Sequence, residues 1–258
     1  ELLETYRRIE NRGALEVAKR TARICSQIFA YGVAAGIVEN NPGAEMSKAL
    51  KVRPKRNWPA LTDPKKLKKL LEAIDTFDGT FPVLCALKFS MLTFARPGEI
   101  RKAEWSEIDL ENSLWTIPAS KMKAKREQLV PLSRQAVSIL KELQPLTASG
   151  QYVFPANRGK SRPMSENTVL AALRRLGYSR DEMVAHSFRS IASTLLHEQG
   201  WPSRVIELQL AHVDQNKIRG IYNRAEHIED RTRMMQAWSD YLDGLKSGAK
   251  ILTINKKA

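Results

Sequence analysis

The sequence predicts a mainly α-helical protein with one small antiparallel β-hairpin, an α+β fold. Apolar residues recur at spacings of three and four along most of the 258 residues, which is the periodicity of amphipathic helices. Two short β-favouring runs interrupt this pattern, at Ser113 to Pro118 and Gln128 to Leu132, and they flank one basic segment. Hydrophobic residues make up 43% of the chain, which is enough for a folded core.

The amino-terminal part of the chain predicts a small helical domain. Apolar residues mark an amphipathic helix from Ala14 to Ile37, and Asn40 to Gly43 ends it. Lys51 to Pro59 then carries four basic residues and two prolines, which suits an extended linker; the alternative is a solvated loop inside one domain. The expected domains are therefore a helical domain at 1–50, a basic linker at 51–60, a larger domain at 61–245 and a tail at 246–258.

The larger domain is predicted to begin with a helix that Asp63 caps and Pro64 opens. A second helix follows from Phe81 to Phe94, and the hairpin carries Lys121 to Arg126 at its tip. Tyr152 to Phe154 is expected to form one more short strand. The remaining helices are expected at 133–143, 165–176, 187–199, 203–210, 214–222 and 226–243.

The charge balance points to a polyanionic partner. The chain has 42 Lys and Arg against 28 Asp and Glu, a formal net charge of +14. Cys25 and Cys85 form no close pair and supply neither a disulfide scaffold nor a cysteine zinc site. The apolar stretch from Val83 to Ala95 is too short to span a bilayer, and no signal peptide is visible, so a soluble cytoplasmic protein is expected. A start in helix without methionine suggests a fragment of a longer protein.

Several kinds of enzyme chemistry lack their sequence motifs. There is no Asp-x-Asp or His-Glu-x-x-His pattern for metal catalysis, and no Walker or Gly-x-Gly-x-x-Gly loop for nucleotides. We therefore expect no cofactor and no metal. The remaining candidates for chemistry are cations, histidines and one tyrosine.

Four short segments carry these candidates. Arg96 ends an apolar helix before Pro97 and Gly98, and Glu99 could pair with it or cap the next helix. His186 and Arg189 lie three residues apart at the start of a helix, which places them near one face. His212 lies between two predicted helices, and Tyr222 follows it by ten residues. Each segment alone also fits a structural role, as a capping residue, a solvated arginine or a packed tyrosine.

Their order along the chain resembles the tyrosine recombinase family, the phage integrases and their relatives. An Arg, a Lys on a hairpin, a His-x-x-Arg, a His and a late Tyr follow one another from Arg96 to Tyr222, and the resemblance extends over residues 14 to 243. The segments Leu210 to Val213, Tyr222 to Ala225, Trp115 to Ala119 and Val130 to Ser133 resemble the prophage integrases typified by the phage P4 enzyme. The resemblance implies a tyrosine recombinase catalytic domain preceded by a partial helical core-binding domain, without the family's arm-binding domain.

The resemblance implies a site-specific recombinase, an integrase that integrates or excises a prophage or genomic island. Tyr222 would attack a DNA phosphodiester, which gives a 3′-phosphotyrosyl link and a free 5′-hydroxyl without metal or ATP. Arg96 and Arg189 would bind the nonbridging oxygens as the transition state gathers negative charge. His186 would act as acid and base near the tyrosine, and His212 would hydrogen-bond the phosphate.

The leaving 5′-oxygen needs a proton, which the family obtains from a hairpin lysine. The sequence offers Lys121, Lys123 and Lys125, and counting back from Val130 favours Lys123. Lys121, Lys125 and Arg126 are then expected to contact phosphate at the tip. In the linker, the expected DNA contacts are Lys51, Arg53, Lys55 and Arg56.

The implied partners are double-stranded DNA at attachment sites and three further copies of the chain, in a homotetramer at the bacterial nucleoid. Directionality or DNA-bending factors are further candidate partners. Trp238 and the apolar tail residues 251–254 are candidates for contact with a neighbouring protomer; the alternatives are that the carboxyl-terminal helix packs on its own domain and that the tail is disordered. Two alternative functions stay open, a type IB topoisomerase and a DNA-binding protein without catalysis.

Overall fold

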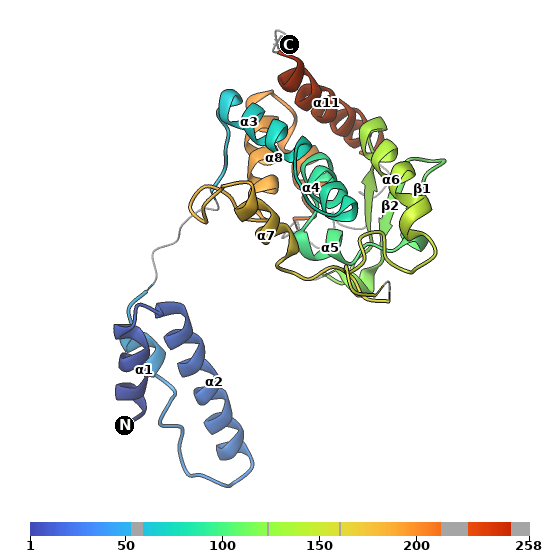
Figure 1. Cartoon of the computed structure of the whole chain (residues 1–258). Coiled ribbons are helices and arrows are strands. Elements are labelled where there is room, and N and C mark those ends of the chain that lie inside the picture. The colour runs from blue at the N-terminus through green and yellow to red at the C-terminus, as the bar shows by residue number, and fades with distance from the viewer. Residues whose placement is uncertain (53–58, 123, 160, 213–226, 249–258) are drawn as a thin grey trace. The chain divides into compact units, whose positions relative to one another are not determined.

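The computed structural model describes residues 1–52, 59–122, 124–159, 161–212 and 227–248. The chain divides into two compact units, Glu1–Asn57 and Trp58–Ala258 (Figure 1). The division falls within the basic segment expected as a linker, of which residues 53–58 lie outside the described part. The predicted helix at 214–222 and the apolar tail also lie outside it.

Unit 1 consists of two helices and one short 3₁₀ turn. Helix α1 spans Leu2–Asn11, α2 spans Leu15–Ala34, and the turn spans Met46–Ala49. A small cluster joins them, made by Tyr6, Ala18, Ala22 and Leu50. The predicted helix from Ala14 to Ile37 is therefore confirmed, although it ends three residues earlier.

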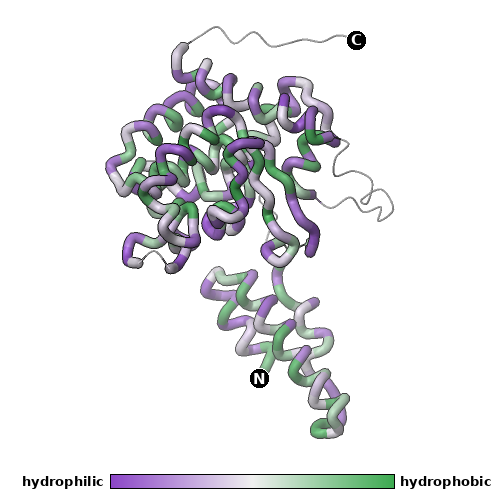
Figure 2. The backbone as a smooth tube through the Cα atoms, turned by 90° about the vertical axis from the view of Figure 1, so that its right-hand side faces the viewer, coloured by the Kyte–Doolittle hydropathy of each residue, from purple (hydrophilic) through white to green (hydrophobic). Residues whose placement is uncertain are grey.

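Unit 2 holds the large core and most of the helices (Figure 1). The side chain of Asp63 accepts the Lys66 N–H, and that of Ser133 accepts the Ala136 N–H, so both begin helices as caps. Hydrophobic and hydrophilic residues alternate along many of its helical turns (Figure 2). The helices are α3 (Pro64–Asp75), α4 (Phe81–Thr93), α5 (Pro97–Arg101), α6 (Arg134–Thr147), α7 (Thr168–Arg175), α8 (Ser187–Glu198), α9 (Ser203–Gln209) and α11 (Ile228–Ser247).

Helix α4 is the centre of unit 2. Its sequence is apolar on every face, and α3, α5, α6, α7, α8 and α11 all contact it. The indole of Trp238 on α11 is fully buried and donates to the Met91 carbonyl at 2.9 Å. Of the two roles left open for Trp238, the structure shows packing on its own domain. No helix in the described part of the chain is both long and apolar enough to cross a membrane.

The predicted hairpin is confirmed and belongs to a three-stranded antiparallel sheet in the order β1-β2-β3. Strands β2 (Leu114–Ile117) and β3 (Gln128–Pro131) pair with Trp115 opposite Val130. Strand β1 (Ile108–Asp109) was not predicted, because two residues carry no alternation. The strand predicted at Tyr152 to Phe154 is wrong: Tyr152 makes one isolated bridge with Glu104, and Pro155 follows at once.

Candidate active site

Arg96 is held at the start of α5 by a carboxylate of the same turn. Glu99 accepts the Arg96 backbone N–H at 2.9 Å and its guanidinium Nη1 at 2.8 Å. The two roles considered for Glu99, ion pairing and capping, are therefore both present. The Arg96 guanidinium also donates through Nη2 to the Ala211 carbonyl at 3.0 Å. Its side chain remains 31% exposed.

Arg189 on α8 is buried beside it and bonds only to backbone carbonyls among the described residues. Nη1 donates to Phe94 at 2.7 Å and Nη2 to Leu210 at 2.6 Å. Phe94 ends α4 with a φ of +39°, a strained conformation for a bulky residue. Burial, and secondarily the charge of Arg96, lower the pKa of Arg189 to about 10, so it stays charged at neutral pH.

The carboxyl end of α9 positions both guanidinium groups. The last carbonyls of a helix have no partner within it, and here Leu210 and Ala211 present theirs to the two arginines. Ala211 takes a φ of +48°, which turns the chain away from the helix axis. Arg96 and Arg189 therefore converge on adjacent residues although they come from different helices. His212 follows directly.

The two histidines differ in their surroundings. His186 precedes α8, and partial burial together with the positive charges of Arg189 and Arg96 lowers its pKa. His212 is exposed, and its Nδ1 meets the Glu207 carboxylate. A carboxylate only accepts, so Nδ1 carries a proton and Nε2 of His212 donates only in the imidazolium form.

Lys121 makes ionic contacts within unit 2. It lies in a 3₁₀ turn (Ala119–Lys121), its ammonium contacts the carboxylates of Glu104 and Glu107, and it donates to the Lys102 carbonyl at 2.9 Å. Burial opposes its charge, but these carboxylates outweigh it and raise the pKa of Lys121. The phosphate contact expected of Lys121 stays a prediction, and the structure shows these intramolecular contacts of its ammonium.

The other predicted DNA contacts are placed only in part. Lys125 and Arg126 are exposed beyond β2, and Lys51 is exposed at the end of unit 1. The candidate acid Lys123 and the candidate nucleophile Tyr222 lie outside the described residues, as do the linker cations Arg53, Lys55 and Arg56. The geometry therefore brings together Arg96, Arg189, His186 and His212.

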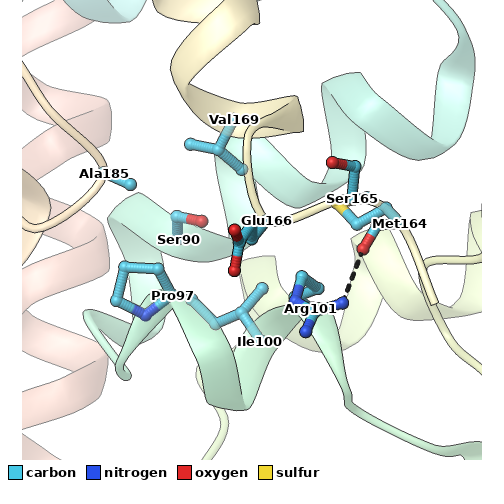
Figure 3. Close-up of a pocket in the computed structure, with 9 residues that line it drawn as sticks. All are labelled: Ser90, Pro97, Ile100, Arg101, Met164, Ser165, Glu166, Val169 and Ala185. Atoms are coloured by element: carbon cyan, nitrogen blue, oxygen red, sulfur yellow. Dashed lines mark hydrogen bonds between the residues drawn. The ribbon is translucent and has the colours of Figure 1, made fainter.

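A small pocket adjoins this cluster (Figure 3). Its lining includes Pro97 and Ala185, the chain neighbours of Arg96 and His186. Arg101 crosses it and donates to the Met164 carbonyl at 3.1 Å, which fixes the segment before α7. The cavity holds about 10 Å³, room for one water molecule and for no larger ligand. In the described part of the chain, His, Cys, Asp and Glu form no group of three that could hold a metal ion.

Two residues near this cluster, Arg231 and Gln209, were not predicted from the sequence. Arg231 on α11 is buried and binds the Gln209 side chain of α9. Its signal was present, because Arg231 shares the spacing of the buried residues Met234, Met235 and Trp238 and so lies on the inner face of that helix.

Residues 61–228 match the phage integrase family, and residues 1–49 match the phage integrase central domain. The chain belongs to the phage integrase family.

Its relatives within the family include prophage and phage enzymes. It is 37% identical over 252 residues to the prophage integrase IntA of Escherichia coli K12, covering 98% of this chain and 60% of that protein. To the integrase of Enterobacteria phage P4 it is 36% identical over 257 residues, covering 94% of this chain and 58% of that protein. The chain thus spans about three fifths of the length of these integrases.

The fold of this chain is similar to that of a solved structure. A lambda integrase tetramer bound to a Holliday junction superposes with a TM-score of 0.62 at 19% identity, covering 84% of this chain and 64% of that one. The tyrosine recombinase fold expected from the sequence is thereby confirmed.

Proposed function

We propose that this chain is the core-binding and catalytic part of a site-specific recombinase that integrates or excises a prophage or genomic island. The observation that carries the proposal is the convergence of Arg96 and Arg189 on the Ala211 and Leu210 carbonyls, beside His212. Two fixed guanidinium groups suit a phosphate whose nonbridging oxygens gain charge during reaction. The sequence identity of 36–37% to prophage and phage integrases supports the same function.

The reaction proposed is strand cleavage by Tyr222. Its phenolic oxygen attacks the phosphorus, the bond to the 5′-oxygen breaks, and the 3′-phosphate stays on the tyrosine. The phenolic proton passes to His186, and the 5′-oxygen takes a proton from Lys123. Reversal with another strand's 5′-hydroxyl rejoins DNA, because the phosphotyrosyl bond conserves the energy of the broken one.

The surroundings of the two histidines fit these roles. A lowered pKa keeps His186 neutral at neutral pH, so its ring can accept a proton. The Glu207 carboxylate accepts from Nδ1 and so orients the ring of His212, whose Nε2 would bind a nonbridging oxygen when it carries a proton. Arg189, charged and buried, supplies a permanent donor.

The proposed partners are duplex DNA at attachment sites and three further copies of the chain. The net charge of +14 supports the DNA partner, and the lambda integrase tetramer on a Holliday junction supports the assembly by analogy. Directionality or DNA-bending factors and a place at the nucleoid belong to the proposal as well, as consequences of acting on chromosomal sites.

The test is covalent capture of DNA. The chain is incubated in EDTA, without ATP, with nicked duplexes whose central sequence is randomised, and denaturation-resistant complexes are recovered and sequenced. We expect a complex that Tyr222→Phe abolishes and that the matched variant Tyr241→Phe retains. A complex that survives Tyr222→Phe, or DNA binding by the unaltered chain without any covalent complex, would overturn the proposal. Strand exchange between two captured duplexes separates recombination from relaxation of supercoils.

A further inference from the structure

Arg231 makes a buried connection between three elements of unit 2. It lies in the first turn of α11 and is 5% exposed. Its Nε donates to the Gln209 side-chain oxygen at 3.1 Å and its Nη2 to the same oxygen at 2.7 Å. Nη2 also donates to the Leu129 carbonyl of β3. One guanidinium therefore joins α11, the end of α9 and the hairpin.

A second side chain reinforces the same junction. Gln128, the first residue of β3, donates through Nε2 to the Leu208 carbonyl at 3.0 Å. The Gln209 amide has one workable orientation, because the flipped form would set its NH₂ against the donors of Arg231. The base of β3 is thus fixed against the last turn of α9.

That turn also orients the candidate active site. The next two carbonyls, of Leu210 and Ala211, hold Arg189 and Arg96. The hairpin that β3 closes carries Lys123, six residues before Leu129. Whatever fixes β3 to the end of α9 therefore fixes the distance from the hairpin to the two arginines.

The charge of Arg231 is not needed to fill this space. Burial lowers the pKa of Arg231 to about 10, and among the described residues its acceptors are neutral oxygens rather than a carboxylate. An apolar side chain of similar length would fill the same volume without desolvating a charge. What an apolar residue cannot do is fix the relative positions of β3 and α9 through directional hydrogen bonds.

We propose that Arg231 is a positioning residue that holds the hairpin bearing Lys123 in register with the two arginines at the end of α9. The inference rests on the proposed strand cleavage and names a residue outside the set that contacts DNA there. Loss of Arg231 is expected to impair delivery of the proton to the leaving 5′-oxygen.

A modified substrate separates this role from general damage. The duplex recovered by covalent capture is made with sulfur in place of the bridging 5′-oxygen. A thiolate leaves without protonation, since a thiol is several pKa units more acidic than an alcohol. Arg231→Met, combined with Gln209→Leu so that the Gln209 amide is not left facing an apolar side chain, is compared with the unaltered chain at saturating DNA.

We expect the variant to cleave the oxygen substrate about 10- to 100-fold more slowly and the sulfur substrate within about 3-fold of the unaltered chain. Gln128→Ala is a milder change in a partly exposed residue. It should also slow cleavage of the oxygen substrate more than that of the sulfur substrate, but by a smaller factor. The matched control Arg233→Met alters an exposed arginine two residues along α11 and should leave both rates unchanged.

Two results would overturn the inference. These are equal slowing of a folded variant on both substrates, or no slowing on either substrate. Melting of the double variant and of Gln128→Ala, followed by circular dichroism, shows which chains are folded. Cleavage by the unaltered chain tests the proposed function separately, because failure there concerns Tyr222 chemistry and failure of sulfur rescue concerns Arg231 alone.

Discussion

His186 stands before α8, where partial burial and the guanidinium groups of Arg189 and Arg96 hold its pKa below the ordinary value of 6.5. Replacing Arg96 by Met removes one of these positive charges and frees the Glu99 carboxylate, which acts in the opposite direction. The Arg96→Met change is therefore expected to raise the pKa of His186. The measurement is an NMR titration of the His186 ring protons in the free protein, and an unchanged or lower pKa would contradict it.

The same shift has a defined effect on stability. A histidine whose pKa is lowered on folding binds protons more readily in the unfolded chain. Its contribution to stability is complete above pH 6.5 and is lost as the pH falls below that value toward the folded-state pKa. His186→Gln should therefore reduce the loss of unfolding free energy between neutral and mildly acidic pH, as measured by urea titration at each pH.

Glu99 supports Arg96 through two bonds to one carboxylate. Glu99→Gln leaves one oxygen acceptor in place of two, so either the backbone N–H or the guanidinium loses its partner. Because Glu99 is buried, we expect a loss of about 1–3 kcal/mol in unfolding free energy and slower DNA cleavage. Urea unfolding measures the first, and an unchanged midpoint would show that water replaces the lost bond.

For single residues, the sequence predicted which side chains form the cluster better than it predicted their hydrogen-bond partners. Arg96, His186, Arg189 and His212 do come together, as the motif order implied. Their acceptors could not be predicted, because Leu210 and Ala211 offer backbone carbonyls that are the same for any sequence. The contact of Glu207 with His212 could not be predicted either, because a carboxylate five residues before a histidine reaches its ring only where the helix has ended between them.

The hairpin shows how one element gives different roles to neighbouring cations. Lys121 contacts Glu104 and Glu107, whereas Lys125 and Arg126 are exposed. Replacing Lys125 or Arg126 by Ala should reduce the salt dependence of DNA binding by about one unit in the slope of log K against log salt concentration. Lys121→Met should leave that slope unchanged.

Lys121→Met is expected to act on stability instead. It leaves two carboxylates without their cation, at a cost of about 1–3 kcal/mol in unfolding free energy. Thermal unfolding and DNA titrations at several salt concentrations test both expectations on the same proteins. A smaller slope for Lys121→Met, with stability intact, would return Lys121 to the phosphate contacts expected from the sequence.

Helices and strands were predictable where several neighbouring residues carried the same signal. The helix from Pro64 followed from its spacing and the cap at Asp63, and the pairing of β2 with β3 followed from two β-favouring runs on either side of a basic segment. Tyr152 to Phe154 failed because three β-favouring residues need a neighbouring strand, which only the tertiary fold supplies or withholds.

Across the whole molecule, the two hydrophobic clusters share no residue. The large one uses residues between Leu67 and Leu245, and the small one uses residues between Tyr6 and Leu50. Composition and the basic segment suggested more than one domain, but the difference in core size depends on which apolar residues find partners. On α2, Ile28 and Tyr31 remain 63% and 73% exposed.

We therefore expect unit 2 to fold without unit 1, and unit 1 not to fold by itself. A chain beginning at Trp58 keeps the entire large cluster, so its melting temperature should stay within about 4 °C of that of the full chain. Among the described residues of unit 1, two alanines, one tyrosine and one leucine form its buried apolar cluster, which we expect to be too little to offset the entropy of folding in a chain of residues 1–57. It should show partial helix and no cooperative transition by circular dichroism. A cooperative transition in 1–57 would show that unit 1 folds on its own, and a large drop in melting temperature for the chain from Trp58 would show that unit 1 stabilises unit 2; either result would contradict this prediction.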